Sequence, residues 1–142
     1  MKLLILIFVI LSQLTFSYIN IYPTKFEKNI TKGVNESFKL YNRSEKEIRY
    51  RIYLEKGLEN DMSQWSEVYP NSITLKPLEE KEIRLFVSPP KTAPKGKYKA
   101  KLIVKEVEIP NARKNNKVNF FTLFKLNMTG YIGEENEKIK KN

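Results

Sequence analysis

Apolar and polar residues alternate along several short stretches of the chain, and this alternation predicts β-strands. The clearest stretch covers residues 46–55, where every second position is apolar or aromatic: Ile48, Tyr50, Ile52 and Leu54. Charged residues and one tyrosine fill the positions between them. A two-residue period is that of a strand with one buried face. This stretch therefore predicts a strand whose apolar side faces a core.

Seven stretches carry this pattern, and prolines or polar turns separate them. They cover residues 18–28, 36–41, 46–55, 73–75, 82–88, 98–104 and 118–131. The first is interrupted by Pro23, which predicts a bent or broken strand near a sheet edge. Val107 and Ile109 shift the alternation after the sixth, which predicts a bulge or a change of environment. Short strands with turns at this spacing predict an all-β, seven-stranded immunoglobulin-like sandwich.

The last stretch differs from the others because it is apolar on both sides. One side carries Val118, Phe120, Phe124, Leu126 and Met128, and the other carries Phe121 and Leu123. Such a strand is either covered on both faces or presents one apolar face to a partner.

The two ends of the chain predict export and a charged tail. Residues 1–17 have Lys2, an apolar run over residues 3–11 and small residues near position 17, the pattern of a secretory signal peptide. An uncleaved signal anchor is the alternative, although Gln13 interrupts the run early. Residues 18–133 form one sandwich domain in this interpretation, and residues 134–142 a disordered tail. The expected location is periplasmic or secreted, with membrane contact only through the transient signal.

Composition narrows the chemistry further. The chain has no His and no Cys, so the usual ligands of zinc, haem and iron–sulfur clusters are missing, and a Ser-His-Asp triad cannot form. The absence of Cys also means that an exported sandwich must be held by packing rather than disulfides. We therefore expect a protein that is not an enzyme and that uses no cofactor or metal.

The formal net charge of +10 leaves two interpretations open. One strand carries lysines at its outward positions: Lys97, Lys99, Lys101 and Lys105. Solubility and edge protection explain such a strand. An anionic polymer could also bind there if outward lysines from several strands share a face. Nucleic acid is not an expected partner of an exported protein.

Two aromatic residues have both an ordinary and a specific interpretation. Tyr98 follows a turn into a late strand, so it is either a core residue or a corner tyrosine bonded to the preceding loop. Trp65 is expected to fill the core or its rim, and a platform for a ligand is the alternative.

Several motifs together resemble a known family. The run W-x4-P-x2-I-x-L-x-P-x5-I-x-L begins at Trp65, and A-P-x-G-x-Y ends at Tyr98. With the opening N-I-Y-P-T-K-F-E and the late F-K-L-N-M, they resemble the N-terminal PapD-like immunoglobulin-like domain of periplasmic pilus-assembly chaperones. The resemblance covers nearly all of the chain after the signal and suggests a single-domain relative.

The resemblance implies a binding site for a secreted or pilus subunit in pilus or fimbria assembly. In that family two basic residues anchor the subunit's C-terminal carboxylate, and the motif matches place Lys25 and Lys125 in those roles. Val118, Phe120 and Thr122 match the exposed positions that pair with the subunit's strand. The alternative is a non-enzymatic structural or adhesion immunoglobulin-like module of the cell envelope. The sequence leaves open whether two copies also associate at an edge strand.

Overall fold

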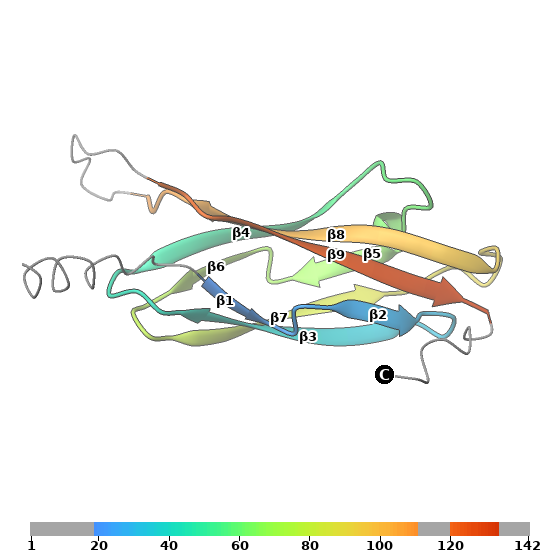
Figure 1. Cartoon of the computed structure of the whole chain (residues 1–142), viewed down its shortest axis with the longest axis horizontal. Helices are drawn as coiled ribbons and strands as arrows, with labels where there is room; N and C mark the ends of the chain where they lie inside the picture. Colours follow the sequence, from blue (N-terminus) through green and yellow to red (C-terminus); the bar gives the residue numbers. More distant parts are fainter. Residues whose placement is uncertain (1–18, 111–119, 134–142) are drawn as a thin grey trace, which may run out of the picture.

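Two β-sheets stacked face to face form the protein (Figure 1). The computed structural model describes residues 19–110 and 120–133. Within them lie nine strands and one 3-10 turn. The strands are β1 (Ile19–Tyr22), β2 (Phe26–Asn29), β3 (Val34–Asn42), β4 (Ile48–Glu55), β5 (Ser66–Tyr69), β6 (Ser72–Leu75), β7 (Glu80–Val87), β8 (Gly96–Val107) and β9 (Leu123–Ile132), and the turn η1 is Ser63–Trp65.

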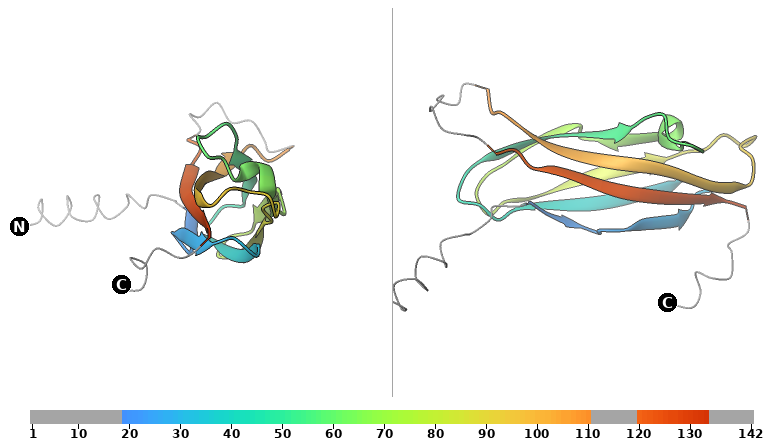
Figure 2. Two further views of the ribbon diagram at one scale, coloured as in Figure 1. Left: turned by 90° about the vertical axis from the view of Figure 1, so that its right-hand side faces the viewer. Right: turned by 45° about the horizontal axis from the view of Figure 1, so that its top comes forward.

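The first sheet has the order β1-β3-β7-β5, and the second has the order β2-β9-β8-β4-β6. Neighbouring strands are antiparallel except β2 and β9, which are parallel. Figure 2 shows the long β8 and β9 crossing the molecule side by side. The predicted all-β immunoglobulin-like sandwich is confirmed.

The structure has nine strands rather than the seven predicted, and two local features explain the difference. The first predicted strand divides at Pro23 into β1 and β2, which join different sheets. Each of them is an edge strand, as the proline predicted. The second addition, β5, was missed because its four residues contain no strong apolar alternation.

The expected bulge at Val107 is absent from the paired part of β8. Its register with β4 runs without a break from Lys101 to Val107, where the strand ends. Ile109 follows the strand, so the shift in the pattern marks the end of β8 rather than an extra residue within it.

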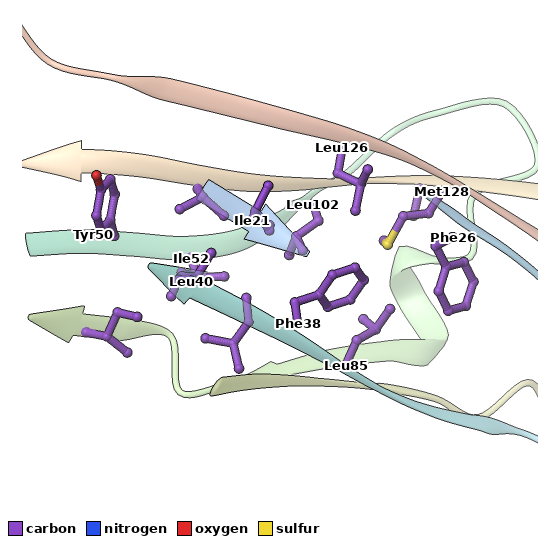
Figure 3. Packing of buried hydrophobic residues seen from close by; sticks show 14 of the residues in the cluster. Ile21, Phe26, Phe38, Leu40, Tyr50, Ile52, Leu85, Leu102, Leu126 and Met128 are labelled. Atoms are coloured by element: carbon purple, nitrogen blue, oxygen red, sulfur yellow. The ribbon is translucent and has the colours of Figure 1, made fainter. Parts of the chain in front are cut away.

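Alternate side chains of both sheets meet in one apolar core (Figure 3). It contains the predicted Ile48, Tyr50 and Ile52, each at most 8% exposed. Burying a side chain of this size stabilises the fold by about 1.5–3 kcal/mol. Trp65 packs against the edge of this core.

Tyr98 holds the turn before β8. Its hydroxyl donates a hydrogen bond to the Pro94 carbonyl at 2.7 Å, and its ring centroid lies 4.9 Å from that of Trp65. Tyr98 thus has the hydrogen bond expected of a corner tyrosine and also packs against the core.

The predicted signal (residues 1–17), the charged tail and Val118 lie outside the described residues. Within the described ranges, no helix has the length and apolar character needed to cross a membrane.

Candidate functional site: the open half of β9

The two halves of β9 have different surroundings. Its later half, Met128–Tyr131, lies between β8 and β2. Its earlier half, Leu123–Asn127, pairs with β8 and with no other strand of the described ranges. We call Leu123–Asn127 the open half of β9.

The open half arises because the N-terminal segment changes from one sheet to the other before it pairs with β9. Residues 19–22 pair with β3 in the first sheet, and only after Pro23 does the chain join β9 as β2. Phe26 is the first residue of β2 and lies opposite Met128. Within the part of the chain that the structure describes, β9 before Met128 therefore keeps one free side.

Two hydrogen bonds show which backbone groups face that free side. The Glu106 N–H donates to the Thr122 carbonyl at 2.8 Å, so the Thr122 carbonyl points toward β8. The Ile30 N–H donates to the Tyr131 carbonyl at 2.8 Å, so the Tyr131 carbonyl points away from β8. Directions alternate along a strand of an antiparallel pair. The N–H and C=O groups of Leu123 and Lys125 therefore point toward the free side.

Apolar side chains are exposed at the start of the open half. Phe120, Phe121 and Leu123 are 89%, 52% and 50% exposed, respectively. Leu126 and Met128, by contrast, are buried, and Phe124 packs against the core. Phe124, Leu126 and Met128 therefore form an inner face in the core. Phe121 and Leu123 lie on an outer face that the described parts of both sheets leave exposed, and Phe120, although on the inner side of the pattern, is exposed as well.

Lys25 lies where the open half meets β2. It directly precedes β2, is 77% exposed, and its Nζ lies 2.7 Å from Glu27 Oε2. Glu27 also accepts a hydrogen bond from the Tyr131 hydroxyl at 2.8 Å. The Lys25 ammonium and this hydroxyl both stabilise the carboxylate, which lowers the pKa of Glu27 below its usual value.

Lys125 lies within the open half, on the same outer face of the sheet as Tyr131. It is exposed and sits beside Ile103 of β8. Because Tyr131 reaches Glu27 and Glu27 contacts Lys25, the structure places both predicted lysines on the same side of the sheet.

The remaining predicted residues have different positions. Thr122 is half-buried, and its N–H donates to Glu106 Oε2 at 2.9 Å, so its backbone is already bonded toward β8. Phe120 is highly exposed just before β9. Sequence reasoning did not single out the backbone of Leu123, because alternation shows side-chain faces but not which strand lies alongside.

The described ranges contain no group of three or more His, Cys, Asp or Glu residues that could hold a metal ion. Hydrogen-bonding backbone groups, exposed apolar side chains and two lysines are what this site offers.

One protein-family model matches residues 37–122, more than half of the chain. Its description reads "IG-like fold at C-terminal of FixG, putative oxidoreductase". The chain belongs to this Ig-like family. In this description the Ig-like fold lies at the C-terminal end of FixG, and the oxidoreductase activity refers to FixG. No curated protein matched the chain in sequence.

Solved structures of several kinds share the fold of this Ig-like chain. One is a chain of the CsuC–CsuE chaperone–tip adhesion subunit pre-assembly complex from Acinetobacter baumannii, with a TM-score of 0.59 and 16% identity over 82% of this chain. The Ig-like chain spans 57% of that chain's length.

Two further neighbours match over most of their own length. SSP-19, an MSP-domain protein like family member of Caenorhabditis elegans, has a TM-score of 0.56 and 13% identity over 81% of this chain and 99% of its own. PapD-like domain 7 of human CEP192 has a TM-score of 0.58 and 12% identity over 84% of this chain and 88% of its own. At these identities the similarity shows the fold alone.

Proposed function

We propose that this Ig-like protein is a chaperone-like binding protein of the periplasm or cell exterior, which pairs the open half of β9 with an extended strand of a protein subunit. The observation that carries the proposal is the free backbone edge of Leu123 and Lys125, next to exposed Phe120 and Phe121. Strand addition uses these two features: backbone hydrogen bonds give affinity and alternate side chains give selectivity.

The position of β2 suggests how a partner strand lies. A strand paired with the open half occupies the same line as β2, and it ends where Phe26 begins. If it runs parallel to β9, as β2 does, its C-terminus points toward Lys25. Lys25 and Lys125 are the cations that we propose for its terminal carboxylate, and charge-assisted hydrogen bonds of this kind are the stronger ones.

The length of the open half limits the contact. Leu123–Asn127 covers about 16 Å at the rise of a strand. A net contribution of about 0.5–1.5 kcal/mol for each hydrogen bond makes backbone pairing alone weak. Apolar contacts with Phe121 and Leu123 and the lysine anchor would supply the rest.

The neighbouring structures support a binding role without assigning a partner. One of them comes from a pre-assembly complex of a chaperone with a tip adhesion subunit of Csu pili. The proposed partner here is accordingly a pilin-like or other exported subunit, and the proposed setting is pilus or fimbria assembly.

A pair of substitutions at Leu123 tests strand pairing. The probe is a labelled ten-residue peptide of alternating Val and Thr, measured by fluorescence anisotropy. Leu123→Pro removes the N–H that faces the free side but no hydrogen bond to β8, so we expect binding to fall about tenfold or more. Leu123→Ala keeps this N–H and should retain a measurable share of the binding. Equal binding by the native protein and Leu123→Pro would contradict strand pairing.

The lysine anchor has a separate test with the same peptide in two forms, one with a free C-terminal carboxylate and one with an amide. We expect Lys25→Ala with Lys125→Ala to weaken binding of the free acid several-fold and to leave the amide unchanged. If both forms weaken alike, the lysines do not hold the carboxylate.

A structural or adhesion module is the second candidate. The chain also matches SSP-19, an MSP-domain protein like family member, over 99% of that protein's length, so the shared fold is not confined to chaperones. This candidate predicts no specific peptide binding at β9, so the Leu123 test distinguishes the two.

A further inference from the structure

Basic side chains gather on the outer face of the five-stranded sheet. The register of β4, β8 and β9 brings together the outward residues Arg49, Arg51, Lys97, Lys99, Lys101, Lys105 and Lys125. The only acidic residue at the outward positions of these three strands is Glu55, which pairs with Lys101 at 3.0 Å. We call this surface the basic face.

Edge protection, one of the explanations that the sequence allows, does not account for the lysines of β8. β8 carries four of these lysines and is the central strand of its sheet, with β9 on one side and β4 on the other. A central strand has no free edge to protect. The lysines therefore need another explanation.

The opposite outer face of the sandwich shows that a sheet of this protein does not need such charge. On the four-stranded sheet, Lys39 pairs with Glu80 at 3.1 Å and Arg84 pairs with Glu82 at 2.7 Å. Positive and negative side chains alternate there, as on an ordinary soluble surface. General solubility would not concentrate the positive charge on one sheet.

The arrangement on β8 is linear. Lys97, Lys99 and Lys101 occupy successive outward positions, which lie about 6.7 Å apart at the rise of a strand. Lys105 continues the line beyond Ile103, while Arg51 and Lys125 flank it on the neighbouring strands. Like charges at this spacing repel one another, and a bound anion removes that cost.

A linear chain fits this stripe better than a flat surface does. Neighbouring strands of a sheet are rotated by about 20–25°, so a plane touches only part of a twisted face (Figure 1). A flexible polymer can follow β8 along its whole length. Tyr53, 41% exposed, lies beside Ile103 in the middle of the face and offers a ring to a sugar.

We propose that the basic face binds a linear acidic polysaccharide, with its carboxylate groups along the β8 lysines and flanking cations. Single-stranded nucleic acid is the less suitable polyanion, because its binding sites interleave several stacking aromatic rings with the cations. The face has Tyr53 and Tyr131 at outward positions, and the Tyr131 ring is engaged by Lys97 Nζ at 5.9 Å from its centroid.

The test uses a labelled oligogalacturonate of about ten sugars and compares two variants that lose the same charge. Lys99→Gln with Lys105→Gln removes two cations of the basic face. Lys39→Gln with Arg84→Gln removes two from the opposite sheet. We expect about tenfold weaker binding at 50 mM NaCl for the first and less than twofold for the second, with affinity falling as salt rises. Thermal melting of each variant checks that both are folded.

Three further samples separate this proposal from its competitors. Leu123→Pro should bind the polysaccharide like the native protein, so loss of peptide binding leaves this proposal standing. Tighter binding to a ten-nucleotide oligothymidylate, or binding only to phosphatidylglycerol vesicles, would overturn the choice of polysaccharide. Equal losses in the two charge variants, or no binding of oligogalacturonate at all, would overturn the site itself.

Discussion

At the scale of single residues, Asn42 is the clearest example of a polar side chain that organises its surroundings. It ends β3 and is 1% exposed. Its amide group lies within hydrogen-bonding distance of three carbonyls, those of Lys46 at 2.7 Å, Lys76 at 3.0 Å and Leu75 at 3.2 Å. Its carbonyl oxygen accepts from the Ser44 N–H and hydroxyl. One side chain thus ties the β3–β4 turn to the end of β6.

Replacing Asn42 should therefore destabilise the fold more than the size of its side chain suggests. Asn42→Ala leaves buried carbonyl groups without their donor, and we expect the free energy of unfolding to fall by about 2–3 kcal/mol. Asn35→Ala, at an exposed position of the same strand, should change it by about 0.5 kcal/mol or less. Urea unfolding followed by circular dichroism measures both, and similar small effects would show that water replaces the Asn42 amide.

At the scale of the element, β9 depends on a glycine at its contact with the loop after β2. A Cβ built on Gly130 would lie 2.7 Å from Ile30 Cδ1 and 2.9 Å from Met62 Sδ. Both of those side chains are fully buried. Because Gly130 has no side chain, Ile30 and Met62, which directly precedes η1, can pack closely against β9.

We expect Gly130→Ala to lower the free energy of unfolding by about 1–3 kcal/mol through overpacking. Ile30→Val removes the nearest methyl group, so Gly130→Ala with Ile30→Val should lose less stability than the two single changes added together. Additive losses in a denaturation series would show that the Ile30 methyl is not what opposes the new Cβ.

The strands also show which features of the fold the sequence predicts and which it does not. The buried faces of β4 and β7 were predicted, because alternation is a local property and each strand keeps one side in the core. The free side of β9 and the central place of β8 were not, because they depend on strand order. β2 pairs with β9 through residues about a hundred positions apart, such as Asn29 and Tyr131. The local alternation of apolar and polar residues cannot predict such a contact.

At the scale of the whole molecule, the free edge and the net charge of +10 have opposite effects on self-association. Two copies could pair their open halves in antiparallel fashion about a two-fold axis. A register centred on Lys125 places this lysine opposite its copy, and like charges directly opposite one another are destabilising. Lys125 would then protect the edge against self-pairing while leaving it open to a partner with a carboxylate.

This balance predicts an unusual response to salt. The distance over which charges act falls from about 10 Å at 0.1 M salt to about 3 Å at 1 M. We therefore expect sedimentation velocity to show a monomer at 0.1 M NaCl and a growing dimer fraction at 1 M, the opposite of the weakening expected for polysaccharide binding. Lys125→Thr should form dimers at lower salt than the native protein, and Leu123→Pro should stay monomeric at both concentrations. A dimer that dissociates as salt rises would instead indicate an interface held by ion pairs, and the open half of β9 would not be the surface that forms it.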